Sequence, residues 1–434
     1  MKRIIPFVGR TLRTDFVKVS AWTSVATVIK MLTSFVSLKV VARIIGPSGL
    51  ALVGQFLNSI TIAGAFSIGG ISQGVTKYVA EHYDKPEVQK MVIGNALRIV
   101  AVCTGIVSAA IIIFSRPLSV YIFKSASYVS LIILLGATLV LYSVNTILTS
   151  ALNGFKSFRK YIWINITISL VGLLLSIVLV LSFGVYGALL NCVASQSIVL
   201  LITFFFISKE PWIKGIITKT VVDWKIIRHL GGFSLMALTS SLFSPLSQIV
   251  IRNMITKEVS LNGAGIWEAM NRISGMYLLF VTTSISTFYL PRLSELKESY
   301  LLKKEIVKTG KIVLPALALT CILIFFCRDI IIAVLFTNEF SAMRGLFAAQ
   351  MLGDFFKMSS WLLACLFWAK AMIKPFVINE AVFGITSVIF TTLFVKLFGL
   401  PGSAYAYALN YFLYMLTMLW LFRRILRSNP DPAL

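Results

Sequence analysis

The chain has 434 residues, of which 58% are hydrophobic and 13% are charged, and its mean hydropathy is +0.90. This composition excludes a soluble globular protein, because the apolar runs reach the length of about 18 residues that marks a membrane-spanning helix. A net charge of +24 would indicate nucleic-acid binding in a soluble protein. In so apolar a chain it indicates basic anchors in cytoplasmic loops instead, and we expect no nucleic-acid partner.

The chain begins with a basic segment and continues in long apolar runs. Met1–Phe16 lacks the apolar core and small-residue cleavage site of a signal peptide, so we expect a cytoplasmic lead-in to the first span. The runs that follow are continuous, as in Ser130–Val144, whereas the strands of a membrane barrel alternate apolar and polar residues. Backbone amides in hydrocarbon must be paired within the segment, so these runs predict helices. We predict an all-α integral membrane protein with about 12 spans, at residues 17–44, 48–76, 91–114, 127–153, 160–182, 186–207, 230–254, 262–290, 305–327, 342–368, 374–395 and 402–422.

The loops between these spans alternate in charge. One set holds about 27 of the 40 Lys and Arg residues, and the opposite set holds about seven. Because cytoplasmic loops of membrane proteins are enriched in Lys and Arg, we expect both termini to be cytoplasmic. The basic loops are the N-terminus, Lys77–Lys90, Lys156–Lys160, Lys209–Arg228, Arg292–Lys311, Lys370–Lys374 and Arg423–Arg427.

Short motifs recur about half a chain apart. Phe183-Gly184-Val185-Tyr186-Gly187-Ala188 returns as Phe398-Gly399-Leu400-Pro401-Gly402-Ser403, and Ser115-Arg116 is echoed by Cys327-Arg328. An even number of spans separates the copies, so we expect two lobes of about six helices with the same orientation, a plan in which transporters bind cargo between repeats. We predict lobes at residues 1–207 and 230–434, with a basic cytoplasmic linker at 208–229.

Ionisable side chains lie within or beside these spans. Such a residue costs a few kcal/mol at bilayer depth and normally faces a bundle interior or a watery cavity. The excess of cations predicts a cavity for an anionic, polar cargo. The cations are Lys30, Lys39, Arg98, Arg252, Arg272, Arg344 and Lys357, and the acids, candidates for ion coupling or charge pairing, are Glu268, Asp354 and Glu380.

Two spans carry polar stripes. Glu268 and Arg272 share a helix face because they are four residues apart. Gln350, Asp354, Lys357 and Trp361 follow one face of a later span, and Trp267, Trp361 and Trp368 lie near the charged stripes. Two interpretations are open: either these stripes line a cavity and contact cargo or protons, or each acid and base only neutralises the charge of the other. Asp354 is our first candidate for proton exchange and Glu268 the second, with a permanent Asp354–Lys357 pair as the alternative.

The sequence contains no motif typical of an enzyme active site. The five cysteines form no CxxC pair, and neither histidine, His82 or His229, has a metal partner in the sequence. The chain contains neither a phosphate-binding GxxxxGK[ST] loop nor a GxGxxG motif. We therefore expect a transporter with no catalytic residues, cofactor or metal, driven by an ion gradient unless transport is passive.

Several motifs resemble one family, the Wzx flippases of bacterial polysaccharide assembly. They belong to the multidrug/oligosaccharidyl-lipid/polysaccharide exporter superfamily, whose drug-exporting members are the MATE transporters. The resemblance is strongest to flippases for enterobacterial common antigen and related O-antigen units. The motifs are Gly46-Pro47-Ser48-Gly49-Leu50, Gly74-Val75-Thr76-Lys77-Tyr78-Val79-Ala80, Phe233-Ser234-Leu235-Met236-Ala237, Gly265-Ile266-Trp267, Leu290-Pro291-Arg292-Leu293-Ser294, Asn338-Glu339-Phe340-Ser341-Ala342-Met343-Arg344 and Gln350-Met351-Leu352-Gly353-Asp354-Phe355-Phe356-Lys357.

The resemblance implies a MATE-like, V-shaped pair of lobes that alternates between inward and outward states in a bacterial inner membrane. The implied cargo is an undecaprenyl-diphosphate-linked oligosaccharide, and the implied partners are membrane lipid and the polymerase and chain-length regulator of polysaccharide assembly. Close relatives carry matching residue types at Lys30, Lys39, Arg252, Arg344, Asp354 and Lys357, whereas Arg272 and Gly275 depart from the common-antigen members.

Three alternatives remain open at the level of the sequence. A drug or cation exporter of the same fold would need an acidic cavity, whereas the predicted cavity is net basic. A membrane glycan polymerase or ligase would need catalytic groups on a sizeable periplasmic loop, and the predicted outer loops are short. The peptidoglycan-precursor flippases have more spans than the number predicted here.

Overall fold

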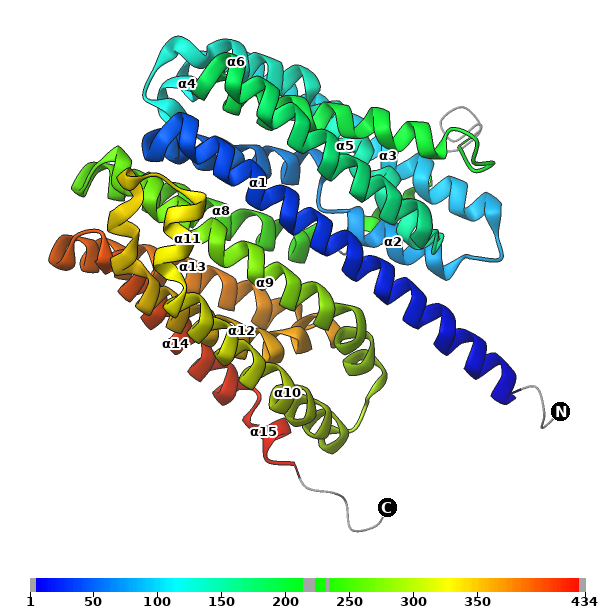
Figure 1. Cartoon of the computed structure of the whole chain (residues 1–434). Helices are drawn as coiled ribbons and strands as arrows, with labels where there is room; N and C mark the ends of the chain where they lie inside the picture. Colours follow the sequence, from blue (N-terminus) through cyan, green and yellow to red (C-terminus); the bar gives the residue numbers. More distant parts are fainter. Residues whose placement is uncertain (1–4, 214–222, 232–233, 429–434) are drawn as a thin grey trace. The chain divides into compact units, whose positions relative to one another are not determined.

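The computed structural model describes residues 5–213, 223–231 and 234–428, and the described part is helical almost throughout, with no strand (Figure 1). The long helices are α1 (Ile5–Ile68), α3 (Pro86–Ile113), α5 (Val129–Gly154), α6 (Phe158–Ile207), α8 (Ser234–Glu258), α9 (Leu261–Glu295), α10 (Ser299–Phe326), α12 (Phe347–Ala369), α13 (Ile373–Phe398) and α14 (Pro401–Leu421). The short ones are α2 (Ser72–Glu81), α4 (Ser115–Phe123), η1 (Ala126–Tyr128), α7 (Trp224–Gly231), α11 (Arg328–Leu335), η2 (Asn338–Leu346) and α15 (Arg423–Leu426).

Two helices are far longer than one membrane crossing requires, and each is divided by a glycine. α1 has 64 residues and bends at Gly46, which has a φ of 64° and precedes Pro47. α6 has 50 residues and bends at Gly184, which has a φ of 54°. A crossing needs about 20 helical residues, so each helix has the length of two crossings. These breaks fall where the sequence predicts the boundaries between spans 17–44 and 48–76 and between spans 160–182 and 186–207.

Two predicted spans differ from the structure in their boundaries. The span predicted at 48–76 is interrupted, because Gly69 and Gly70 have φ values of 64° and 68° and separate α1 from α2. The span predicted at 342–368 begins as the 3₁₀ helix η2, and its α-helix starts only at Phe347. The residues of α2 and η2 are more polar than those of the helices beside them, a signal that the predicted spans did not use.

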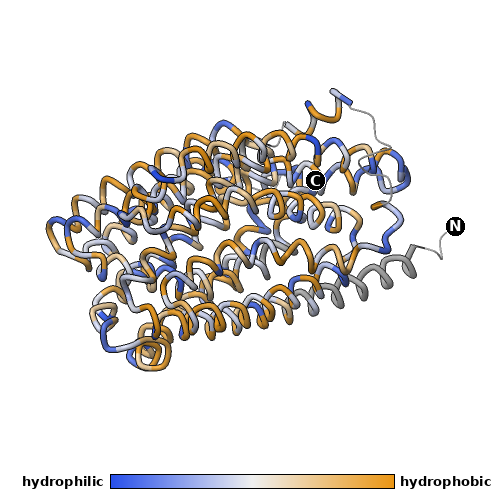
Figure 2. Tube along the Cα trace, turned by 90° about the horizontal axis from the view of Figure 1, so that it is seen from above, coloured by the Kyte–Doolittle hydropathy of each residue, from blue (hydrophilic) through white to orange (hydrophobic). Residues whose placement is uncertain are grey.

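Six helices of the described residues are long and apolar enough to cross a membrane, judged by length and composition. Hydrophobic residues, orange in Figure 2, run along the long helices of the trace. The six segments are Val25–Ile68, Pro86–Ile113, Ala126–Gly154, Phe158–Ile207, Ser299–Phe326 and Ile373–Phe398. The long helices α8, α9, α12 and α14 are not among these six, and they supply most of the polar residues of the cavity described below.

The chain forms two compact units, each with its own packing. Unit 1 contains residues 1–37 and 59–242, and unit 2 contains residues 38–58 and 243–434. The middle of α1 therefore packs with the C-terminal helices. The lobes predicted at 1–207 and 230–434 stay a prediction, and much of the predicted linker, residues 214–222, lies outside the described part.

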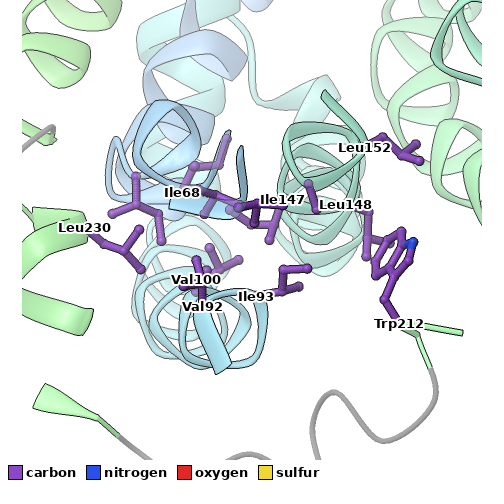
Figure 3. Close-up of a cluster of buried hydrophobic side chains, with 14 of the residues drawn as sticks. Ile68, Val92, Ile93, Val100, Ile147, Leu148, Leu152, Trp212 and Leu230 are labelled. Atoms are coloured by element: carbon purple, nitrogen blue, oxygen red, sulfur yellow. The ribbon is translucent and has the colours of Figure 1, made fainter. Parts of the chain in front are cut away.

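Unit 1 is built on α5, which packs against α2, α3 and α6. A cluster of buried apolar side chains joins these helices to Trp212 and Leu230 (Figure 3). Trp212 and Leu230 are in this cluster with exposed fractions of 8% and 0%, so the chain is anchored to unit 1 within the predicted linker and directly after it. The other labelled members are Ile68, Val92, Ile93, Val100, Ile147, Leu148 and Leu152.

Unit 2 is centred on α12, which packs against α9, α10 and α14, while α13 packs against α14. Close helix approach is visible at Gly353 on α12, where a Cβ atom would clash with the ring of Tyr407 on α14. This packing brings the polar face of α12 against α9 and α14, and so positions the candidate site.

The internal repeat seen in the sequence has a counterpart in local structure. Gly184 and Gly399 both adopt positive φ, at 54° and 65°, each between two long helical segments. Three residues later, a Cβ atom at Gly187 or Gly402 would clash with a backbone carbonyl, of Leu179 and Phe394 respectively. Each repeat therefore carries the same tight break between helices, which explains why the motif retains its glycines.

Candidate functional site

Unit 2 contains a polar cavity among its helices. Its volume is about 390 Å³, within the range of roughly 300–1,000 Å³ typical of small-ligand pockets. Residues from α8, α9, α12, α13 and α14 line it. Amides and hydroxyls are frequent in the lining, which includes Gln248, Asn271, Asn410, Ser244, Ser247, Ser274, Ser387, Thr391 and Ser403.

Two charged side chains line this cavity, Lys357 on α12 and Glu380 on α13. The ammonium group of Lys357 lies over two aromatic rings of α14, at 5.7 Å from the ring centre of Tyr407 and 5.2 Å from that of Tyr411. Aromatic faces attract cations without neutralising them. Among the described residues neither Lys357 nor Glu380 forms an ion pair, so the Lys357 charge is oriented but available to an anion in the cavity.

Asp354 is held by hydroxyl groups rather than by Lys357. Ser274 and Tyr277 on α9 donate hydrogen bonds to its Oδ2 at 2.6 and 2.5 Å, and Tyr407 on α14 donates to Oδ1 at 2.7 Å. Gln350 donates to Ser274 at 3.1 Å and extends the network. The side chain is fully buried and ties α12 to its two neighbours. Ion exchange at Asp354, predicted from the sequence, stays a prediction.

A second buried network joins α1, α8 and α9. The Glu268 carboxylate accepts from Arg252 at 2.5 Å through Oε2 and from Arg272 at 2.9 Å through Oε1. Arg252 also donates to Gln55 Oε1 at 2.9 Å, and Gln55 donates to Asn253 at 3.3 Å. The Arg252 and Glu268 side chains are 3% and 9% exposed. The pairing of Glu268 with Arg272 follows their spacing on one helix, but Arg252 and Gln55 join from other helices.

The remaining predicted site residues lie elsewhere. Arg344 on η2 forms an exposed ion pair with Asp329 on α11, at 3.0 Å. Lys39 is half-buried in the α1 segment of unit 2, and Lys30 is exposed in unit 1. Arg98 is half-buried on α3 of unit 1. Eight of the ten predicted residues thus lie in unit 2, and six of these belong to the cavity lining or to one of the two buried networks: Arg252, Arg272, Lys357, Glu268, Asp354 and Glu380.

Aromatic residues form part of the cavity wall. Trp267 and Trp361 line it, as expected from their position beside the charged stripes, whereas Trp368 is 43% exposed and packs on Phe376. The sequence analysis overlooked α14, whose Tyr407, Tyr411 and Tyr414 also line the cavity. Their spacing of four and three residues places them on one helix face, a signal that was present in the sequence.

The arrangement suits non-covalent binding of a polar molecule. Buried amides, hydroxyls and a cation can replace the water that a sugar or phosphate loses on entering the membrane. Indole and phenol rings add flat apolar surface beside these groups. No group of His, Cys, Asp and Glu that could hold a metal ion occurs among the described residues.

Comparison with known proteins identifies relatives of nearly full length. The model of the family described as "Polysaccharide biosynthesis protein" matches residues 16–297. The "Lipid III flippase" of Escherichia coli (strain K12) and that of Shigella flexneri are each 31% identical over 397 residues, which cover 92% of this chain and 95% of the relative. These relatives are transport proteins, in agreement with the expectation of a transporter rather than an enzyme.

Solved structures establish the fold. A multidrug resistance MATE family transporter in its inward-facing conformation gives a TM-score of 0.80 at 15% identity, covering 93% of this chain and 96% of that one. An outward-facing conformation of such a transporter gives a TM-score of 0.70 at 16% identity, with coverages of 94% and 95%. The predicted all-α, MATE-like membrane fold is confirmed. The chain is a multi-pass inner membrane protein of MATE-like fold, and it belongs to the polysaccharide biosynthesis protein family that includes the lipid III flippases.

Proposed function

We propose that this protein is a flippase that moves a polyprenyl-diphosphate-linked oligosaccharide of the lipid III type from the cytoplasmic to the periplasmic leaflet. The observation that carries the proposal is the polar cavity of unit 2, with its cation held over tyrosine rings, in a chain that shares 31% identity with lipid III flippases. Sugars and diphosphate cannot cross hydrocarbon unaided, because the loss of their hydration costs several kcal/mol or more per group.

The cavity residues divide the work of binding. Lys357 attracts an anionic group of the cargo, and its position over Tyr407 and Tyr411 fixes where that group binds. Asn271, whose buried Nδ2 has no hydrogen-bond partner among the described residues, can donate to a sugar oxygen. Trp267 and Trp361 offer flat faces to sugar rings. The polyprenyl chain stays in lipid while the head group crosses by alternating access.

The buried arginines that do not line the cavity have a different role. Arg252 and Arg272 already share the carboxylate of Glu268, so we assign Arg252 to holding α8 against α9, and Arg272 to the charge balance of Glu268, rather than to binding cargo. The exposed pair of Arg344 and Asp329 has no place in this site. Association with a polymerase or chain-length regulator stays a prediction.

Orientation follows from the loop charges. We propose that both termini and the basic segment Lys209–Arg228 are cytoplasmic, because basic loops are retained on that side of the membrane. The cavity of unit 2 then has to be reached from the cytoplasm first and from the periplasm later in the transport cycle.

Genetic complementation tests the proposed function. The chain is expressed in an Escherichia coli strain that lacks its own lipid III flippase, and the surface polymer that depends on that flippase is measured. We expect the polymer to return, whereas the Lys357→Gln variant, at equal membrane abundance, restores little. A membrane-inserted wild-type chain that restores no polymer would contradict lipid III as the cargo.

A further inference from the structure

The acidic residues of unit 2 differ in how completely their oxygens are engaged. Both oxygens of Glu268 accept from arginines, and both oxygens of Asp354 accept from hydroxyl groups. Glu380 lines the cavity, and no hydrogen bond or ion pair engages its carboxylate among the described residues. Of these three acids, Glu380 is therefore the one that can gain or lose a proton without breaking a buried network.

Lys357 is the charged group that faces Glu380. The two interact electrostatically across the cavity, although they are too far apart for an ion pair. Tyr411 and Tyr414 approach from α14, and Tyr414 also interacts with the Glu380 charge. From α8 and α9 the cavity receives only neutral side chains. The charge of Lys357 is thus the main compensation for a carboxylate at Glu380.

We propose that Glu380 takes up a proton when an anionic group of the cargo engages Lys357, and releases it when the cargo leaves. In the empty cavity Lys357 compensates the Glu380 carboxylate. A cargo anion at Lys357 leaves that carboxylate uncompensated, and an unpaired charge at this depth is costly. The carboxylate then binds one proton from water and becomes a neutral carboxylic acid. The cavity is neutral in both states.

This inference rests on the proposed function. It can be measured because proton binding and cargo binding are thermodynamically linked. If cargo binding favours protonation of Glu380, protonation must favour cargo binding by the same factor. The charged and titratable groups that line the cavity with Glu380 are Lys357 on α12 and Tyr407, Tyr411 and Tyr414 on α14. Asp354 also interacts with the Lys357 charge, and three hydroxyl donors engage its own oxygens.

Proton uptake on cargo binding is the first test. Lipid III is added to the purified protein in weakly buffered detergent solution, with a pH-indicator dye, and binding is followed separately by tryptophan fluorescence. We expect about one proton per bound lipid for the wild type. Glu380→Gln should bind lipid III without this uptake, and Glu298→Gln, at an exposed position before α10, should behave as the wild type. Binding by Glu380→Gln with undiminished proton uptake would overturn the inference, whereas failure of the wild type to bind lipid III would overturn the proposed function.

A second test needs no cargo. Dicyclohexylcarbodiimide reacts with protonated carboxyl groups in apolar surroundings, and mass spectrometry locates the modified residue. Lys357→Gln removes the compensating charge, so Glu380 should become modified at neutral pH in this variant and much less in the wild type. Lys304→Gln, an exposed change on α10, should leave the modification as in the wild type. An unmodified Glu380 in the Lys357→Gln variant would overturn the inference.

Discussion

Lys357 is the residue on which cargo binding depends most in this account. A hydrogen bond to a charged group contributes about 1.5–3 kcal/mol. Loss of the charge in Lys357→Gln should therefore weaken lipid III binding about 10- to 100-fold, as measured by tryptophan fluorescence on the purified protein. The exposed Lys304→Gln serves as a matched control and should bind normally. Equal affinity of the two variants would remove Lys357 from the site.

Arg252 stabilises the packing of α8 against α9, so its substitution should lower the stability of the folded protein. Removing one partner of a buried ion pair costs about 3–5 kcal/mol, so Arg252→Met should lower the melting temperature in detergent strongly. Arg252→Met combined with Glu268→Gln should be less damaging than the sum of the two single changes, because the double variant loses the Arg252–Glu268 contact only once. The exposed Arg344–Asp329 pair, with side chains 62% and 55% exposed, provides the contrast, since Arg344→Met should cost about 0–1 kcal/mol. Additive effects of the Arg252 and Glu268 changes would contradict a coupled network.

Sequence reasoning identified site residues wherever one helix carries the pattern. The spacing of Glu268 and Arg272 predicted a shared face, and the two side chains are indeed paired. It could not predict that Tyr407 on α14 would donate a hydrogen bond to Asp354. That contact depends on how α12 and α14 pack rather than on the periodicity of either helix. The same holds for Gln55, which reaches Arg252 only through the packing of α1 residues 38–58 in unit 2.

At the scale of elements, the repeated glycine break is the feature most open to test. A Cβ atom at Gly187 or Gly402 would clash with a backbone carbonyl oxygen, so the backbone would have to shift. Overpacking of this kind costs about 1–3 kcal/mol, so Gly187→Ala and Gly402→Ala should each lower the melting temperature. Gly105 and Gly172 lie inside α3 and α6 with open space around them, and alanine there should be neutral or stabilising by up to about 1 kcal/mol. Similar melting temperatures for all four variants would refute a special role of the break.

Long helices were predictable from hydropathy, and their interruptions were not. The predicted spans coincide closely with α3, α5, α13 and α14, because continuous apolar runs specify helices in hydrocarbon. The break after Ile68 depends on two consecutive glycines with positive φ, and the polar residues that follow in α2 were included in a predicted span although they lower its hydropathy. The 3₁₀ start at Asn338–Leu346 was missed for the same reason.

At the scale of the whole molecule, the charge bias of the loops makes a prediction about topology. Reporter fusions after residue 219 and at the C-terminus should report a cytoplasmic location, because both sites adjoin basic segments. A fusion at Lys124, in a loop of the weakly basic set, should report the periplasm. A periplasmic signal from the residue 219 fusion would contradict the proposed orientation of the lobes.

The family and the fold were both accessible from sequence, because the resemblance rests on motifs spread along the chain and the fold on hydropathy. The position of the polar cavity could not be predicted from the sequence. Eight of the ten predicted charged residues lie in unit 2, whereas Lys30 and Arg98 belong to unit 1. A count of charges within spans cannot distinguish a residue that lines a cavity from one that stabilises helix packing.

Transbilayer movement of lipid III by the purified protein tests the central claim most directly. The protein is reconstituted into vesicles containing lipid III with a fluorophore on its glycan, and a membrane-impermeant quencher is added outside. Protein-free vesicles should lose only the signal of the outer leaflet. Vesicles that contain the protein should lose nearly all of it, because flipping exposes the inner pool. If vesicles with folded protein also lost only the outer-leaflet signal, the chain would not be a flippase for this cargo.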